Sequence, residues 1–192
     1  MSDQPGAREV LFFWFGAPPE QGKRHKRWFE KDPAFDGLIA ERFFPLYEKA
    51  ARGELAHWQE RPADCLALIL ILDQFPRNMF RGTARAFAAD PLALEAARHA
   101  VAQGFDRTFP PVERLFAYLP FEHSERLEDQ LTACELIEPL KAFPETADAY
   151  PYALAHRDII QRFGRFPHRN SILGRASSAE EIEFLKQPGS GF

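Results

Sequence analysis

The sequence predicts an all-α protein of about eight or nine helices with no sheet. Apolar residues recur at three- and four-residue spacing along most of the chain, and no stretch alternates as a half-buried strand does. Prolines, glycines and capping residues also interrupt the chain at helix-length intervals. With 192 residues and 45% hydrophobic content, residues 1–192 are expected to form a single helical domain with its own core.

Capping residues set the expected helix boundaries. Asp32 with Pro33 supplies a capping carboxylate and a proline at the first helical position, and Asp90 with Pro91 repeats this signal. Gly104 is expected to end the helix that Asp90 opens, in the left-handed conformation. The expected helices cover residues 8–15, 33–51, 62–75, 92–103, 111–119, 124–140, 150–163 and 178–186. A charged segment, 20–30, carries Trp28 and Phe29, which are expected to face inward.

One helix is expected at the centre of the fold. Its residues 66–72 are apolar all round, which is typical of a helix surrounded by other helices. Ser124 is expected to cap a later helix, and Ser178 with Glu181 forms a capping box for the last one. On the helix that Ser124 opens, the residues expected to face the core are Leu127, Leu131, Cys134, Ile137 and Leu140.

A short phrase occurs twice. Residues 73–78 read Asp-Gln-Phe-Pro-Arg-Asn, and residues 163–170 read Phe-Gly-Arg-Phe-Pro-His-Arg-Asn. In both, the aromatic–proline pair is expected to end a helix, because proline restricts the residue before it and has no N–H to donate. The arginine and asparagine that follow would then be held rigidly. We call residues 73–81 the first corner and residues 163–170 the second corner.

Both corners are basic in a chain of net charge −4. Residues 122–145 hold seven acids, and one interpretation is that these pair with the corners, where exposed pairs contribute only about 0–1 kcal/mol. The other is that the corners converge on one cavity and present arginines to an anionic ligand. The candidate ligand-binding residues are Asp73, Arg77, Asn78, Arg81, Ser124, Arg165, Arg169 and Asn170.

Three titratable residues are candidates for an ion pair or for proton transfer. Asp73 lies at the C-terminal end of an apolar helix, where the helix dipole disfavours a carboxylate, so it needs a partner. We expect that partner to be an arginine of the second corner, in a structural ion pair or a general-base arrangement. His123 and His168 are the candidate catalytic residues for proton transfer. A Ser–His nucleophile pair is not expected, because no nucleophile-elbow pattern appears.

No cofactor or metal site is expected. The six histidines include no His-x₃-His pair, and the two Glu-x-x-His motifs of di-iron bundles are not present, since only Glu54 and His57 have this spacing. Cys65 and Cys134 are expected to be buried thiols. The net charge gives no attraction to nucleic acid or to a membrane surface, and the apolar run at 10–15 is too short to span a bilayer. These features favour a soluble, cytoplasmic protein.

Several longer phrases resemble a bacterial family known as domain of unknown function 924. They lie at residues 13–16, 28–36, 72–82, 162–170 and 180–190 and cover essentially the whole chain. The resemblance implies an all-α fold similar to that of tetratricopeptide-repeat proteins, in which pairs of helices form an α–α superhelix. It implies no established activity and no assigned catalytic residues. The chain has no readable 34-residue repeat, so the likeness would be structural only.

Two functional hypotheses follow. The first is a cytoplasmic protein that binds a small anionic metabolite in an arginine-lined polar pocket, with hydrolase or transferase activity as an extension. The second is an interaction scaffold whose concave helical face takes a protein segment, with purely structural corners. Converging corners around an enclosed pocket would favour the first hypothesis, and dispersed corners would favour the second. Exposed aromatic residues would also be compatible with a homodimer.

Overall fold

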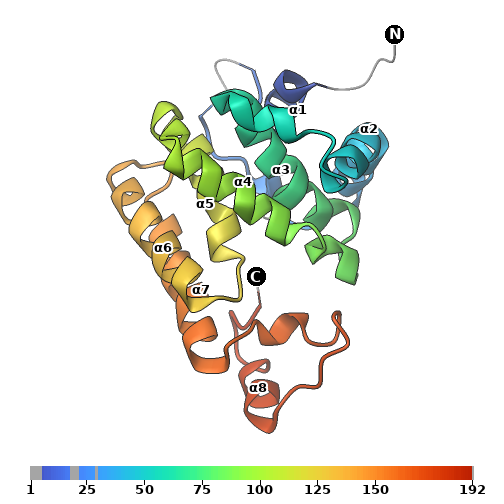
Figure 1. Cartoon of the computed structure of the whole chain (residues 1–192). Helices are drawn as coiled ribbons and strands as arrows, with labels where there is room; N and C mark the ends of the chain where they lie inside the picture. Colours follow the sequence, from blue (N-terminus) through green and yellow to red (C-terminus); the bar gives the residue numbers. More distant parts are fainter. Residues whose placement is uncertain (1–5, 18–21, 29, 192) are drawn as a thin grey trace.

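The computed structural model describes residues 6–17, 22–28 and 30–191, and this part of the chain is helical without a strand (Figure 1). The prediction of an all-α fold is therefore confirmed. The α-helices are α1 (Ala7–Phe15), α2 (Pro33–Ala51), α3 (Pro62–Met79), α4 (Asp90–Ala102), α5 (Pro111–Glu122), α6 (Leu127–Ile137), α7 (Ala149–Phe163) and α8 (Ala179–Phe184). Short 3-10 helices lie at Lys26–Trp28, Ala56–Glu60, Ala84–Phe87, Phe105–Thr108, Glu138–Ala142 and Pro167–Arg169.

Helix α3 lies at the centre, as its all-round apolar sequence predicts. It contacts α1, α2, α4 and α5, which surround it in Figure 1. Every side chain from Leu66 to Leu72 is at most 3% exposed. Burial of this continuous apolar surface is the main stabilising contribution that the helix can make. It also fixes the C-terminal end of α3, where the first corner begins.

Aromatic rings join α3 to the N-terminal elements. Trp14 of α1 packs against Trp28, Phe35, Phe75 and Phe116, with ring centroids 5.5–6.1 Å apart. Trp28 is buried, as predicted, and its Nε1–H donates to the carbonyl oxygen of Trp14 at 3.0 Å. The prediction for Phe29 lies outside the described residues. This cluster holds the short 3-10 helix at Lys26–Trp28 against α5.

The C-terminal third packs beside this core through α5. Helices α6 and α7 lie side by side, and α5 contacts both (Figure 1). A smaller apolar cluster joins Ile159 and Ile160 of α7 to Phe166. Phe163, at the end of α7, and Phe184, at the end of α8, pack against it. The chain then returns, so that Gly191 lies against the side chain of His168. The second corner is thereby enclosed by the last part of the chain.

Most predicted boundaries are confirmed by their caps. The Asp32 carboxylate accepts hydrogen bonds from the backbone N–H groups of Ala34 and Phe35, and Pro33 takes the first helical position of α2. Gly104 follows α4 with φ of 69°, the left-handed conformation that glycine adopts without strain. The reciprocal capping box of Ser178 and Glu181 opens α8.

The expected helix end at Phe75–Pro76 is wrong. Helix α3 continues through Pro76 to Met79, because tertiary contacts hold the turn after the proline: Arg77 binds Asp90, and Asn78 donates to Asp36. Helix α5 likewise continues past Leu119, through Pro120 to Glu122. In the second corner Gly164, at φ of 67°, ends α7, and Pro167 starts a 3-10 turn instead.

The inward face predicted for residues 124–140 is partly wrong. Helix α6 begins at Leu127, and Ser124 accepts a hydrogen bond from the N–H of Arg126 without being the N-cap residue. Leu127 and Leu131 are 39% and 47% exposed, whereas Cys134, Ile137 and Leu140 are buried as expected. The reason is that Gln130 turns inward and its amide donates to backbone carbonyls at the end of α5, including that of Glu122 at 2.6 Å.

Candidate functional site

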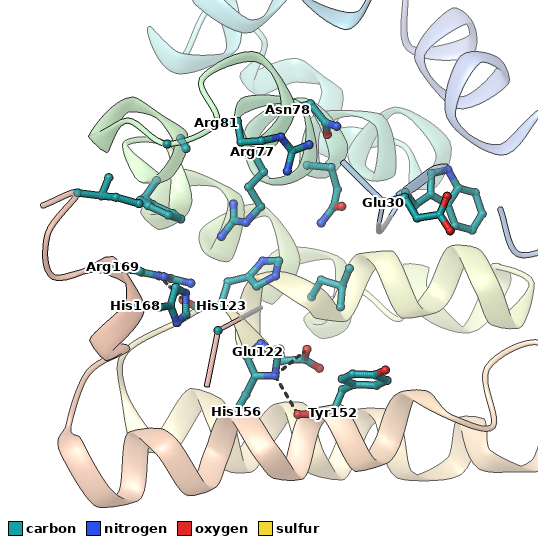
Figure 2. Close-up of a pocket in the computed structure, with 18 of the residues that line it drawn as sticks. Glu30, Arg77, Asn78, Arg81, Glu122, His123, Tyr152, His156, His168 and Arg169 are labelled. Atoms are coloured by element: carbon teal, nitrogen blue, oxygen red, sulfur yellow. Dashed lines mark hydrogen bonds and ion pairs between the residues drawn. The ribbon is translucent and has the colours of Figure 1, made fainter. Parts of the chain in front are cut away.

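The two corners meet at one cavity. The cavity has a volume of about 570 Å³ and lies among α3, α5, α7, the 3-10 turns at residues 84–87 and 167–169, and the C-terminal segment (Figure 2). This volume falls within the range of pockets that hold small molecules. Of the predicted site residues, those that line it are Arg77, Asn78, Arg81, His123, His168 and Arg169.

Arg77 is held by carboxylates on both sides. Its Nη1 and Nη2 donate to Oδ1 and Oδ2 of Asp90 at 2.8 and 3.0 Å, and Nη1 also donates to the backbone carbonyl of Asp73 at 2.6 Å. Asp90 was expected to cap α4, but α4 has no side-chain cap. The Asp90 carboxylate binds Arg77 instead. Oδ1 of Asp73 also lies 3.3 Å from Nη1 of Arg77. The positive charge of Arg77 is therefore balanced by two carboxylates of the protein.

Asp73 is fully buried and binds His123. Oδ1 of Asp73 accepts a hydrogen bond of 2.7 Å from Nδ1 of His123, and Oδ2 accepts one of 2.6 Å from the Gln74 amide. The expected partner, an arginine of the second corner, is thus wrong: a histidine at the end of α5 and Arg77 of the same helix take that place. Burial alone would raise the pKa of Asp73, but Arg77 and His123 lower it below its usual value.

This contact orients the His123 ring. With Nδ1 donating to Asp73, Nε2 is the basic nitrogen of this ring, and His123 lines the cavity. Burial and the nearby Arg77 guanidinium lower the pKa of His123 below its usual value, so the ring is neutral near pH 7. The pair has the arrangement of a histidine base held by a carboxylate.

Arg169 comes from the second corner and is buried beneath two rings. Its guanidinium carbon lies 4.4 Å from the ring centre of Phe166 and 4.7 Å from that of Phe87, and Nη1 donates to the backbone carbonyl of His123 at 3.0 Å. Its closest carboxylate contact, to Asp90, is 3.6 Å, beyond hydrogen-bond distance. Within the described part of the chain, Nε of Arg169 is buried and makes no hydrogen bond.

The electrostatics at Arg169 differ from those at Arg77. Burial and the positive charge of Arg77 lower the pKa of Arg169 to about 10, which means that its charge is poorly compensated by the protein. Burial and the charge of Arg169 also lower the pKa of His168 to about 4, so that ring is neutral near pH 7. An anion beside Arg169 would supply both a counter-charge and a hydrogen-bond acceptor.

Two residues that the sequence did not single out complete the polar wall. Glu122 and His156 are buried, and Oε1 of Glu122 lies 3.2 Å from Nδ1 of His156, which also donates to the Tyr152 carbonyl at 2.8 Å (Figure 2). Burial and the negative charge of Asp73 raise the pKa of Glu122 to about 8, and burial lowers that of His156 to about 3. One signal was available: Glu122 follows an otherwise apolar helical turn, residues 115–121.

The remaining predicted site residues lie outside this cavity or bind other protein groups. Arg165 forms a bidentate pair with Glu181, and Asn170 is buried between Ser177 and Arg175. Ser124 lines a second cavity, of about 470 Å³, which His123 and Arg169 also line. Asn78 and Arg81, although at the edge of the main cavity, both donate to Asp36.

The acidic segment and the corners pair only in part. Glu125 binds Arg175 through both its oxygens and accepts the N–H of Phe166, whereas Arg77 and Arg81 pair with acids of other elements. Among the described residues, no group of three or more His, Cys, Asp or Glu side chains is placed to hold a metal ion. In the same residues, no helix combines the length and apolarity needed to cross a membrane.

Comparisons with known proteins give the family. Residues 10–189 match the family described as "Bacterial protein of unknown function (DUF924)". The chain belongs to this family. A solved structure, that of a protein of unknown function from Agrobacterium tumefaciens, is similar to this one with a TM-score of 0.83 and 44% identity, over 94% of this chain and 96% of that chain. No curated protein matches the sequence.

Proposed function

We propose that this DUF924 protein binds a small organic anion in the cavity and acts on it as a hydrolase or transferase. The observation that carries the proposal is Arg169, which lines a cavity of ligand size and carries a buried guanidinium whose charge is poorly compensated by the protein. An anion bound beside this guanidinium would compensate its charge in a buried setting, where a charge-assisted hydrogen bond is strong.

Arg169 fits this role better than the other arginines of the corners. The charge of Arg77 is balanced by Asp73 and Asp90, so it serves to position Asp73 and the end of α3. Arg81 already binds Asp36 through two nitrogens. The neutral state of His123 and His168 near pH 7 leaves Arg169 as the cation that an anionic group would meet first.

The proton-transfer groups lie on the same wall. His123, held by Asp73, would accept a proton at Nε2 from the attacking water of a hydrolase or from the attacking hydroxyl of a transferase. Glu122, whose pKa is raised to about 8, is protonated near pH 7 and could pass its proton to the leaving group. A base and an acid with pKa values moved in these directions, side by side at the end of α5, support an acid–base role.

A cytoplasmic location is part of the proposal. Cys65 and Cys134 are both free, buried thiols, which suits a reducing compartment.

A thermal-shift screen of carboxylated and phosphorylated metabolites tests the proposal. We expect at least one anion to raise the melting temperature of the wild type and to lose most of this effect in Arg169→Gln. Arg107→Gln, an exposed arginine that does not line the cavity, is the matched control and should bind as the wild type does. An unchanged response in Arg169→Gln would overturn the anion site, and the absence of any response would favour the interaction scaffold.

A further inference from the structure

The cavity changes character along helix α5. Leu115, Leu119, Glu122 and His123 all line it, at spacings that place them on one face of the helix. The first two are apolar and the last two are titratable, so the wall passes from hydrocarbon to polar groups within eight residues. At 1.5 Å per residue this distance is about 12 Å. The cavity therefore has an apolar end and a charged end.

The apolar end is built from carbon surfaces. Trp28, Leu115, Leu119 and Ala149 line it, and each is at most 8% exposed. The Nε1–H of Trp28 points away into the core, toward the carbonyl of Trp14, so the indole offers the cavity no polar atom of its own. This end can bind hydrocarbon, and the charged side chain that Figure 2 labels on this side is the carboxylate of Glu30.

The charged end lies on the opposite side. In Figure 2, Arg169, His168 and His123 lie together, whereas Glu30, two residues after Trp28, lies at the far side of the cavity. Arg24, which also lines the cavity, forms an ion pair with Asp148. One anionic group at Arg169 would thus leave the rest of a ligand directed along α5 toward Trp28.

We propose that the ligand is an amphiphilic organic acid, with one anionic head group at Arg169 and a hydrocarbon body along Leu119 and Leu115 toward Trp28. This inference rests on the proposed anion site and adds the chemistry of the other half of the ligand. A short, highly polar metabolite would leave the apolar end empty. A second anionic group on the ligand would have to lie among Trp28, the leucines and the carboxylate of Glu30, which is unfavourable because of both desolvation and like-charge repulsion.

A chain-length series measures the apolar end. Binding of acetate, butyrate, hexanoate and octanoate is followed by isothermal titration calorimetry, at concentrations below those at which the acids form micelles. We expect the affinity to rise about fourfold per added methylene, since each buried methylene contributes about 0.8 kcal/mol and 1.4 kcal/mol is tenfold. Octyl phosphate and octanoate compare the two head groups, and 1-octanol lacks the charge.

The outcomes separate the two proposals. Acetate binding as tightly as octanoate would overturn the amphiphilic ligand and leave the anion site standing. Octanol binding as tightly as octanoate would overturn the anion site, and the absence of binding by every acid would overturn both. Affinity that rises with chain length and falls in Arg169→Gln supports both.

A pair of leucine variants locates the hydrocarbon. Leu119→Ala should flatten the dependence on chain length, while acetate binding stays as in the wild type. Leu131→Ala is the matched control, because Leu131 is 47% exposed on α6 and does not line the cavity. Circular dichroism and thermal unfolding establish that both variants are folded. Equal chain-length dependence in the two variants would overturn the placement of the hydrocarbon along α5.

Discussion

The carboxylate of Asp73 lies 2.7 Å from Nδ1 of His123, although 50 residues separate them in the chain. The contact joins the last part of the central helix to the end of α5, and it links the fully buried Asp73 to His123, which lines the cavity. It satisfies a fully buried carboxylate and at the same time fixes which histidine nitrogen carries the proton. A structural and a chemical requirement are thus met by one hydrogen bond.

The Asp73–His123 contact predicts the protonation state of His123. At pH 7 we expect a neutral ring with the proton on Nδ1, because Asp73 accepts from Nδ1 and the pKa of His123 is lowered. Nitrogen-15 NMR of the imidazole distinguishes the two tautomers and the charged form. A ring that carries its proton on Nε2, or a charged imidazolium at this pH, would contradict the assignment.

Replacing the Asp73 carboxylate tests its structural role. Asp73→Asn should lower the free energy of unfolding by about 3–5 kcal/mol, because Arg77 and His123 lose a buried partner. Asp64→Asn is the matched control on the same helix: Asp64 lies 3.6 Å from Arg61 at the surface, and its loss should cost about 0–1 kcal/mol. Urea unfolding measures both, and equal losses would show that Asp73 has no special role.

Glu122 predicts a dependence of stability on pH. Its pKa is raised in the folded state to about 8 from an ordinary value of 4.5, so the folded protein retains a proton that the unfolded chain has released. The stabilising effect of this proton is fully present below pH 4.5 and is lost as the pH rises toward 8. Glu122→Gln removes this decline, so the stability of the variant relative to the wild type should increase between pH 5 and 8. Urea unfolding at several pH values checks this, and a difference independent of pH would contradict it.

Truncating a side chain on the buried face of α6 should lower the free energy of unfolding much more than the same change on its exposed face. Ile137 is fully buried and Leu131 is 47% exposed. Ile137→Ala should lower the free energy of unfolding by about 2–5 kcal/mol, and Leu131→Ala should change it by no more than about 0.5 kcal/mol. Chemical unfolding of the two variants measures the difference. A large cost at Leu131 would support the face predicted from the sequence, or reveal a contact with another molecule.

Arg165 is predicted to hold the C-terminal segment in place. Its guanidinium donates to both oxygens of Glu181 and to the carbonyl of Ala176, and it does not line the cavity. Arg165→Gln should therefore speed hydrogen exchange in residues 176–186 and leave anion affinity unchanged. A loss of affinity with unchanged exchange would instead return Arg165 to the binding site.

The helices and most of their boundaries could be predicted from the sequence. The stop of α2 at Ala51, the left-handed Gly104 and the capping box at Ser178 depend on neighbouring residues, which the sequence displays directly. The prolines at 76 and 120 misled the prediction, because long-range contacts stabilise the helical turns that follow them. The outward turn of Leu131 depended in the same way on Gln130, whose carbonyl partners lie in α5 and the turn that follows it.

The candidate site could likewise be predicted only where it depends on local sequence and not on contacts between distant residues. The sequence alone determined that two basic corners exist, that α3 is central and that Asp73, His123 and Arg169 needed explanation, because these are statements about residue type and local pattern. The tertiary structure decided that the corners line one cavity, that His123 is the partner of Asp73 and that Glu122 belongs beside them. Burial and charge proximity set the pKa values of these groups, and both depend on contacts between residues far apart in the chain.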